Sequence, residues 1–136
     1  MSDIKISTGI QTYRFFDEDD NLIAQFRINP MDVNLADRAM ETADWFDSIK
    51  SELGNGTVHD LSRFNGELEE KIAYVLGYEP KDLFGVITAT TVLPGGDMWA
   101  AIILDKIISE IEPQVQKRTK AMEKAQQKYL KKYEPK

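Results

Sequence analysis

Residues 98–111 read MWAAIILDKIISEI. This stretch is apolar on nearly every face of a helix, and a helix of that kind is buried on most of its faces. In a chain of 136 residues it is either the central helix of the domain or a helix shared with another subunit. Pro94-Gly95-Gly96 breaks the chain before it, and Asp97 is the expected cap of the helix.

The sequence after this stretch becomes basic. Residues 117–136 hold eight Lys and Arg against two Glu, so they carry a net charge of +6. Because the whole chain carries −6, residues 1–116 carry −12. Pro113 predicts a kink or a restart of the helix near Glu112. A thin helical stripe continues beyond it through Val115, Met122, Tyr129 and Tyr133.

Two further helices are predicted before the apolar stretch. The first has Asp32 or Asn34 as its cap and ends at Gly54-Asn55-Gly56. Its apolar positions recur at helical spacing, at Leu35, Ala39, Ala43, Phe46, Ile49 and Leu53.

The second helix has Thr57 or Asp60 as its cap and ends at Gly77. Its apolar positions are Leu61, Phe64, Leu68, Ile72 and Leu76. Gly66 lies inside it and costs about 1 kcal/mol relative to Ala, which predicts a break or a frayed start before Glu67.

The chain between the second helix and the apolar stretch gives weaker signals. Residues 79–85 predict a short helical turn. Residues 86–93 are rich in β-branched side chains, which favours a strand, but a short buried helix is an equal alternative.

A β-hairpin is predicted near the N-terminus, within residues 10–30. Tyr13 and Phe15 alternate with polar residues before an acidic turn at residues 17–21, and Asn29-Pro30 ends the second strand. The alternation resumes after the turn at Leu22, Ala24, Phe26 and Ile28.

These elements predict an α+β fold that is mostly helical. The N-terminal hairpin packs on three to four helices, and the last helix is long. We expect one domain over residues 1–136, with a hairpin at 10–30, a helical body at 33–112 and a basic helical extension at 113–136.

Composition narrows the classes of function. The chain has no Cys, so a disulfide framework, a thiolate metal site and a Cys nucleophile are excluded. Its N-terminus lacks the pattern of a signal peptide. The longest apolar run, Met98–Leu104, is too short to span a bilayer, so we expect no membrane partner. The acidic body argues against nucleic acid as the main ligand.

No constellation of side chains predicts catalysis, a cofactor or a metal. His59 is the one histidine, and neither a nucleophilic Ser motif nor a Cys accompanies it. Residues 17–21 are acidic, but they lack the Gly and the distal Glu of a calcium loop. We therefore expect no enzyme, no cofactor and no metal site.

The basic extension leaves three interpretations open. It is a solvated helix, or a helix that docks on an acidic protein surface, including the body of another copy, or a weak nucleic-acid site. In the last case Tyr129 and Tyr133 would stack on bases.

Three stretches carry a resemblance to a known family. They are Phe26-Arg27-Ile28-Asn29-Pro30-Met31-Asp32, then Asp82-Leu83-Phe84-Gly85, and finally Lys128-Tyr129-Leu130-Lys131-Lys132-Tyr133. In this order, on an acidic chain of this length, they resemble the tail assembly chaperones of long-tailed phages and prophages of Gram-positive bacteria. Those proteins are encoded between the major tail protein and the tape measure protein.

The resemblance implies a non-enzymatic helper. Such chaperones coat the tape measure protein, present it to tail tube subunits and tend to form homo-oligomers. They act in the cytoplasm of the infected or lysogenic bacterial host, and a longer frameshifted form is common. Met31, Met40, Met98 and Met122 are adaptable contact residues compatible with such a role.

We therefore expect protein–protein interaction in phage tail assembly. Two alternatives are a structural tail tube or connector protein of the virion and a small phage regulator that binds nucleic acid. The candidate contact residues are Trp99, Ile103, Ile107, Met122, Tyr129 and Tyr133.

Overall fold

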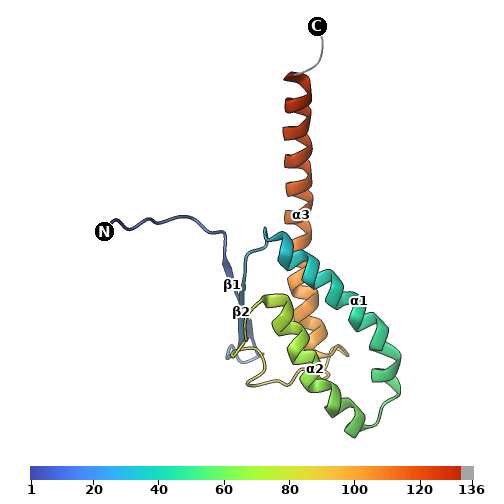
Figure 1. Ribbon diagram of the computed structural model, residues 1–136. Coiled ribbons are helices and arrows are strands. Elements are labelled where there is room, and N and C mark those ends of the chain that lie inside the picture. Colours follow the sequence, from blue (N-terminus) through green and yellow to red (C-terminus); the bar gives the residue numbers. More distant parts are fainter. Residues whose placement is uncertain (133–136) are drawn as a thin grey trace.

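The computed structural model describes residues 1–132, apart from the side chains of Tyr129, Lys131 and Lys132. A two-stranded hairpin precedes three helices (Figure 1). The α+β, mostly helical fold predicted from the sequence is confirmed. The elements are β1 (Gln11–Phe16), β2 (Leu22–Ile28), α1 (Val33–Asn55), α2 (Val58–Leu76) and α3 (Trp99–Lys132).

The hairpin forms where the alternation of apolar residues predicts it. β1 and β2 pair antiparallel, with Tyr13 opposite Phe26 and a register shift between Phe15 and Phe16. The Asp17 carboxylate closes the turn, because it accepts hydrogen bonds from the backbone N–H groups of Asp19 and Asn21, each at 2.9 Å. These bonds also lower the pKa of Asp17, with that from Asn21 contributing most.

Local signals set the ends of α1 and α2. The Asp32 side chain accepts from the N–H of Asn34 and caps α1. Thr57 and Asp60 form a capping box at the start of α2. Gly77 ends α2 in the left-handed conformation, at φ 81°, and donates its N–H to the carbonyl of Ala73.

Three predictions about breaks and turns were wrong. α2 passes through Gly66 without interruption, because helical neighbours on both sides outweigh the intrinsic cost of one glycine. Residues 79–85 contain turns and bends but no helix. Residues 86–93 form neither alternative, strand or helix; they are a loop held by one bridge between Val92 and Met98.

The start of α3 also differs from the prediction that Asp97 caps it. Within the described residues, the Asp97 side chain makes no hydrogen bond to the first turn. Instead, the N–H of Trp99 donates to the carbonyl of Thr91 at 2.8 Å, and the N–H of Ala100 donates to that of Ala89 at 3.0 Å. The preceding loop thus satisfies the amides that a cap would otherwise satisfy.

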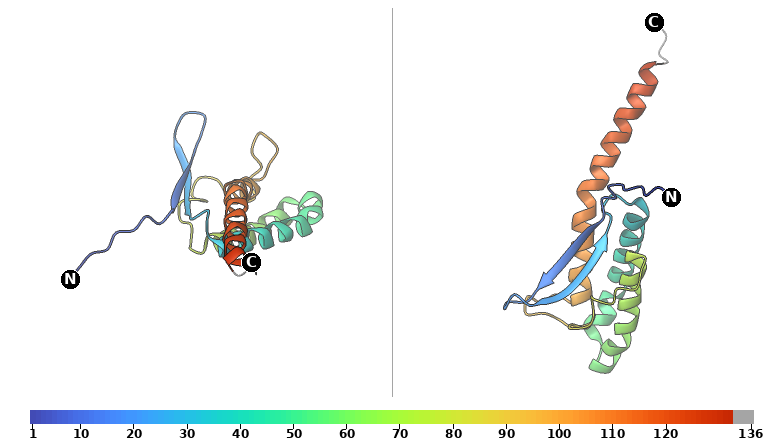
Figure 2. Two further views of the ribbon diagram at one scale, coloured as in Figure 1. Left: turned by 90° about the horizontal axis from the view of Figure 1, so that it is seen from above. Right: turned by 90° about the vertical axis from the view of Figure 1, so that its left-hand side faces the viewer.

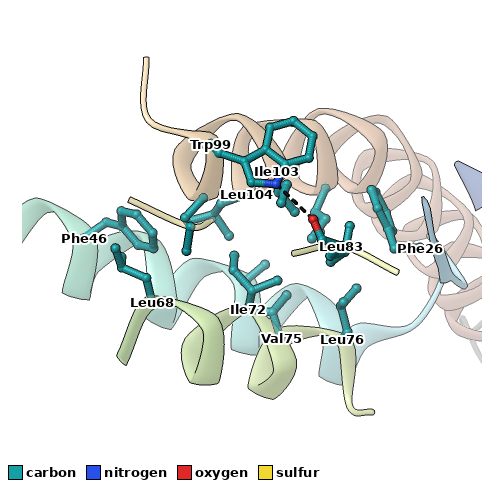
Figure 3. Packing of buried hydrophobic residues seen from close by; sticks show 14 of the residues in the cluster. Phe26, Phe46, Leu68, Ile72, Val75, Leu76, Leu83, Trp99, Ile103 and Leu104 are labelled. Carbon is teal, nitrogen blue, oxygen red and sulfur yellow. Dashed lines mark hydrogen bonds between the residues drawn. The ribbon is translucent and has the colours of Figure 1, made fainter. Parts of the chain in front are cut away.

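The first half of α3, Trp99–Ile111, is the centre of the core (Figure 3). Ile103 and Ile107 are fully buried, and the Trp99 indole Nε1–H donates to the Leu83 carbonyl at 3.0 Å. We call this half the anchored half. The α1–α2 pair and the hairpin pack around it. The buried side chains from those elements include Phe26, Leu35, Phe46, Leu68, Ile72 and Val75.

The inner face of the hairpin packs on the anchored half through aromatic rings. Phe15 meets the Trp99 ring edge to face, with centroids 5.1 Å apart, and Tyr13 stacks on Phe26 at 5.1 Å. The Tyr13 hydroxyl donates to the Glu110 carboxylate at 3.4 Å. Burial, and then the Glu110 charge, raise the pKa of Tyr13 above 10.0.

The second half of α3, Glu112–Lys132, extends away from the body (Figures 1 and 2). We call it the arm. Its described side chains are exposed, apart from the partly buried Gln114. At 1.5 Å per residue the arm is roughly 30 Å long. The helix continues through Pro113 without a break, so the predicted restart near Glu112 does not occur.

Candidate protein-binding surface

The structure buries three of the six candidate contact residues. Trp99, Ile103 and Ile107 are 2%, 0% and 0% exposed, and their neighbours belong to the same chain. A partner could reach them only by opening the core, so we assign them to the core and not to a contact surface. Of the two placements predicted for this stretch, the central helix is the one observed.

The other three candidates belong to the arm or follow it. Met122 is 57% exposed and does not belong to the core cluster formed by the described residues. The backbone of Tyr129 is helical, but its side chain lies outside the described part of the structure, and Tyr133 lies outside it altogether. Among the described side chains, Met122 is therefore the one candidate that a partner could reach without opening the core.

An apolar groove lies at the base of the arm. It runs between the first half of α1 and the middle of α3 and encloses about 580 Å³. Its apolar side chains are Val33, Ala36, Ala39 and Met40 from α1 and Ile108, Ile111 and Val115 from α3. We call this feature the groove.

Exposed apolar side chains stand on both walls of the groove. Val33, Met40 and Val115 are 50%, 54% and 42% exposed, which is high for large apolar residues in helices. Such a concave apolar site with few polar groups is typical of a protein- or ligand-binding surface.

The start of α1 is held against the arm by local contacts. The Asp32 cap fixes where α1 begins, which places Val33 at the mouth of the groove. The Arg118 guanidinium Nη1 donates to the backbone carbonyl of Met31 at 2.9 Å. This bond ties the arm to the chain just before α1, so both walls of the groove keep their separation.

Charge around the groove is asymmetric. Asp37 and Glu112 line it from α1 and α3, and none of the basic side chains that the structure describes lines it. The arm is basic on the face opposite Val115 and Met122, where Lys117, Lys120, Lys124 and Lys128 recur at helical spacing. The arm therefore presents Val115 and Met122 on one face, with Arg118 between them, and a row of lysines on the other.

Sequence reasoning did not identify the groove as a site. It singled out Met40 as an adaptable residue, but it did not connect Met40 with Val33 or with Val115 on another helix. The available signal was apolar residues at 33, 36 and 40, which lie on one face of α1 apart from the row of buried residues. Which element faces that row depends on tertiary packing.

Two other polar clusters have structural explanations. The Asp17 carboxylate is occupied by the hairpin turn. His59 is exposed in the first turn of α2, beside a hollow of about 440 Å³ that it does not line. That hollow is lined by Glu52, Asp60 and Glu67, with Arg63 3.8 Å from the Asp60 carboxylate.

Among residues 1–132, no cluster of three or more His, Asp or Glu side chains has the arrangement of a metal site. Over the same residues, none of the helices combines the length and the apolar character that crossing a bilayer requires. Comparison of the chain with protein families, with curated proteins and with solved structures found no match in any of the three.

Proposed function

We propose that this chain is a non-enzymatic protein-binding protein that chaperones the tape measure protein during phage tail assembly. The observation that carries the proposal is the groove together with the apolar face of the arm. Together they present exposed apolar side chains that the described residues do not cover. The site of action would be the cytoplasm of the infected or lysogenic bacterial host.

The geometry suits a helical client. Val33 and Met40 are one face of α1, and Ile108 and Val115 are one face of α3, so a client helix would lie between two helices and insert its apolar side chains. Methionine at such a site adapts its shape to different apolar partners. A long, largely helical tape measure protein would offer many segments of that kind.

The net charge of −6 is compatible with this role, because a chaperone must stay in solution while it exposes apolar surface. The identity of the client, and the handover to the tail tube protein, come from the resemblance of three short stretches to tail assembly chaperones. The gene neighbourhood is an inexpensive first check. A very long reading frame directly downstream would supply the client for the experiment.

Co-expression tests the proposal directly. The tape measure protein is produced with and without this chain, and the soluble fraction is quantified after centrifugation. We expect the chain to raise the soluble amount of client several-fold. A client that is equally soluble in both cultures would overturn the proposal.

A matched pair of variants locates the effect. Met40→Glu places a charge in the groove, whereas Val58→Glu places the same charge on an exposed residue at the start of α2, away from the groove. Met40→Glu should lose most of the solubilising effect, and Val58→Glu should keep it. Equal loss in both variants would show that the groove does not bind the client.

One observation favours a second function, a structural protein of the virion. β2 is covered at its outer edge, because the N–H of Gln25 donates to Asp82 O and that of Arg27 to the Tyr78 hydroxyl. Within residues 1–132, β1 has no hydrogen bonds at its outer edge. A strand of another subunit could extend the sheet there.

Mass spectrometry of purified virions separates the two functions. A tail tube or connector protein must be present in the finished particle at many copies, whereas a chaperone should be absent. Detection of the chain at the abundance of known tail proteins would favour the structural function.

A further inference from the structure

We infer that the groove accepts a particular class of helix, one whose row of apolar side chains has a lysine or an arginine on each flank. The cation on one flank would lie beside Asp37 of α1, and the cation on the other flank beside Glu112 of α3. The inference rests on the proposed function, because it takes the groove as the place where a client helix docks. It deepens that function by naming the charge pattern of the segment that binds.

The length of the groove sets how much of a helix it can hold. Its wall on α1 runs from Val33 to Met40, and its wall on α3 runs from Ile108 to Val115. Each pair of residues is seven positions apart. Each wall is therefore roughly 10 Å long, or about two helical turns. A client helix of that length presents three apolar side chains to the groove, at positions i, i+3 or i+4, and i+7.

The two carboxylates lie near the middle of the groove on opposite walls. α1 and α3 run in opposite directions, so the first turn of one wall faces the last turn of the other (Figures 1 and 2). Asp37 follows Val33 by four positions, and Glu112 follows Ile108 by four. Each is thus close to the centre of its own wall. A helix docked between the walls would have one carboxylate on either side.

Both carboxylates are accessible to a partner. Asp37 and Glu112 are exposed, and neither takes part in any of the three ion pairs formed among the described side chains. An apolar helix would strip water from them without replacing it, which is unfavourable for a charged group. A lysine or arginine on each flank would restore a charged partner, and its methylene groups would cover the apolar wall.

Cations beyond the groove restrict where the client can carry its own. Lys117 and Arg118 follow the groove on α3, and Arg118 is held near the start of α1 by its 2.9 Å bond to the Met31 carbonyl. A client lysine at that end would meet like charge, whereas one near the middle would meet Asp37 or Glu112. The expected selectivity therefore depends on the position of the client's cations as well as on their number.

Three synthetic helical peptides of equal length test the inference. All have leucines at i, i+4 and i+7. The first has one lysine on each flank of the leucine row, the second has the same composition with both lysines on the opposite face, and the third has glutamates in place of the flanking lysines. Because the first two have equal charge, the long-range attraction of the acidic body is the same for both.

Fluorescence anisotropy of each labelled peptide, titrated with the full chain, gives the dissociation constants. We expect the first peptide to bind at least tenfold more tightly than the second, and the third to bind most weakly. Equal affinity of the first two peptides would overturn the inference. A third peptide that binds as tightly as the first, or no binding of any of the three, would also overturn it.

Variants of the two carboxylates locate the selectivity. Asp37→Asn with Glu112→Gln keeps the side-chain shapes and should reduce the difference between the first two peptides to less than threefold. Asp37→Lys with Glu112→Lys should reverse the order, so that the glutamate peptide binds more tightly than the lysine peptide. A purely structural role of the two residues would not reverse it.

A matched control makes the same change in net charge outside the groove. Glu18→Lys with Asp19→Lys alters two exposed residues of the hairpin turn and should keep the original order of the peptides. If the groove variant with two lysines kept the wild-type order, or if the hairpin variant reversed it, the inference would be overturned.

The inference and the proposed function fail in different ways. A chain that keeps the tape measure protein soluble but binds the first two peptides equally would overturn the inference alone. A chain that distinguishes the peptides as expected but leaves the tape measure protein insoluble would overturn the proposed function alone.

Discussion

The two halves of α3 are one continuous helix, yet they have opposite surroundings. In the anchored half, Trp99, Ile103 and Ile107 are enclosed by the hairpin, α1 and α2. In the arm, Val115, Met122 and Leu130 are 42%, 57% and 63% exposed. Tertiary packing stabilises the first half, whereas among the described side chains of the second half Arg118 alone hydrogen-bonds to the body. The difference assigns stability to the anchored half and leaves the arm accessible to a partner.

The largest effect is expected from a cavity in the anchored half. Trp99→Ala removes a buried indole and leaves the Leu83 carbonyl without its donor, so the free energy of unfolding should fall by about 4 kcal/mol. Urea unfolding followed by circular dichroism measures it. Met122→Ala in the arm is the control and should change stability by less than about 0.5 kcal/mol. Similar losses in both variants would contradict the division of α3.

The second-largest change in the free energy of unfolding is expected from a substitution at the junction of the two halves. Pro113 cannot donate a hydrogen bond to the preceding turn, and Pro costs about 3 kcal/mol relative to Ala inside a helix. Proline also restricts the unfolded chain, and this lower conformational entropy of the unfolded state offsets part of that cost. Pro113→Ala should therefore raise the free energy of unfolding by about 2 kcal/mol. An unchanged value in the same urea experiment would indicate that the arm melts independently of the body.

A pH titration tests the contact between the hairpin and the anchored half. The pKa of Tyr13 is raised in the folded chain, chiefly by burial and then by Glu110, so the fold favours the neutral phenol. Stability from this group is complete below about pH 10 and is lost as the pH rises through the higher folded pKa. The free energy of unfolding should therefore fall less steeply at alkaline pH in Tyr13→Phe than in wild type. The two slopes should differ by at most about 1.4 kcal/mol per pH unit.

Thermal unfolding of Tyr13→Phe and wild type from about pH 8 to about pH 11, a range that brackets the ordinary pKa of tyrosine, measures the difference. Tyr74 is an internal control, because it retains its own raised pKa, chiefly from its hydrogen bond to Glu41, in both proteins. Parallel curves for the two proteins would contradict the Tyr13–Glu110 contact.

Removal of the arm should have the smallest effect on stability. A chain that ends at Gln116 keeps the wall of the groove but loses the exposed helix and its +6 charge. At dilute protein and physiological salt, its free energy of unfolding should stay within about 0.5 kcal/mol of the full chain. A loss above about 2 kcal/mol would mean that the arm packs on its own body.

Sequence reasoning succeeded where neighbouring residues decide the structure. Asp32, the Thr57–Asp60 pair and Gly77 set helix ends through contacts only a few residues apart, and these can be identified from the sequence. The hairpin followed from alternation and from a turn that Asp17 closes by itself. In each case the partners of a hydrogen bond are close in the chain.

Sequence reasoning failed where contacts between distant segments of the chain decide the structure. Asp97 has the chemistry of a cap, but carbonyls from the loop at 89–91 bind the first amides of α3. Trp99, Ile103 and Ile107 have the composition of an interface as much as of a core, and only the packing of other elements distinguishes the two. The groove was missed for the same reason, because its walls come from residues about seventy positions apart.

The late position of the anchored half has a consequence during synthesis. The hairpin, α1 and α2 leave the ribosome before Trp99–Ile111, the stretch whose side chains complete the core that these elements share. Until that stretch emerges, the apolar faces that it covers stay exposed, and the nascent chain is prone to aggregation.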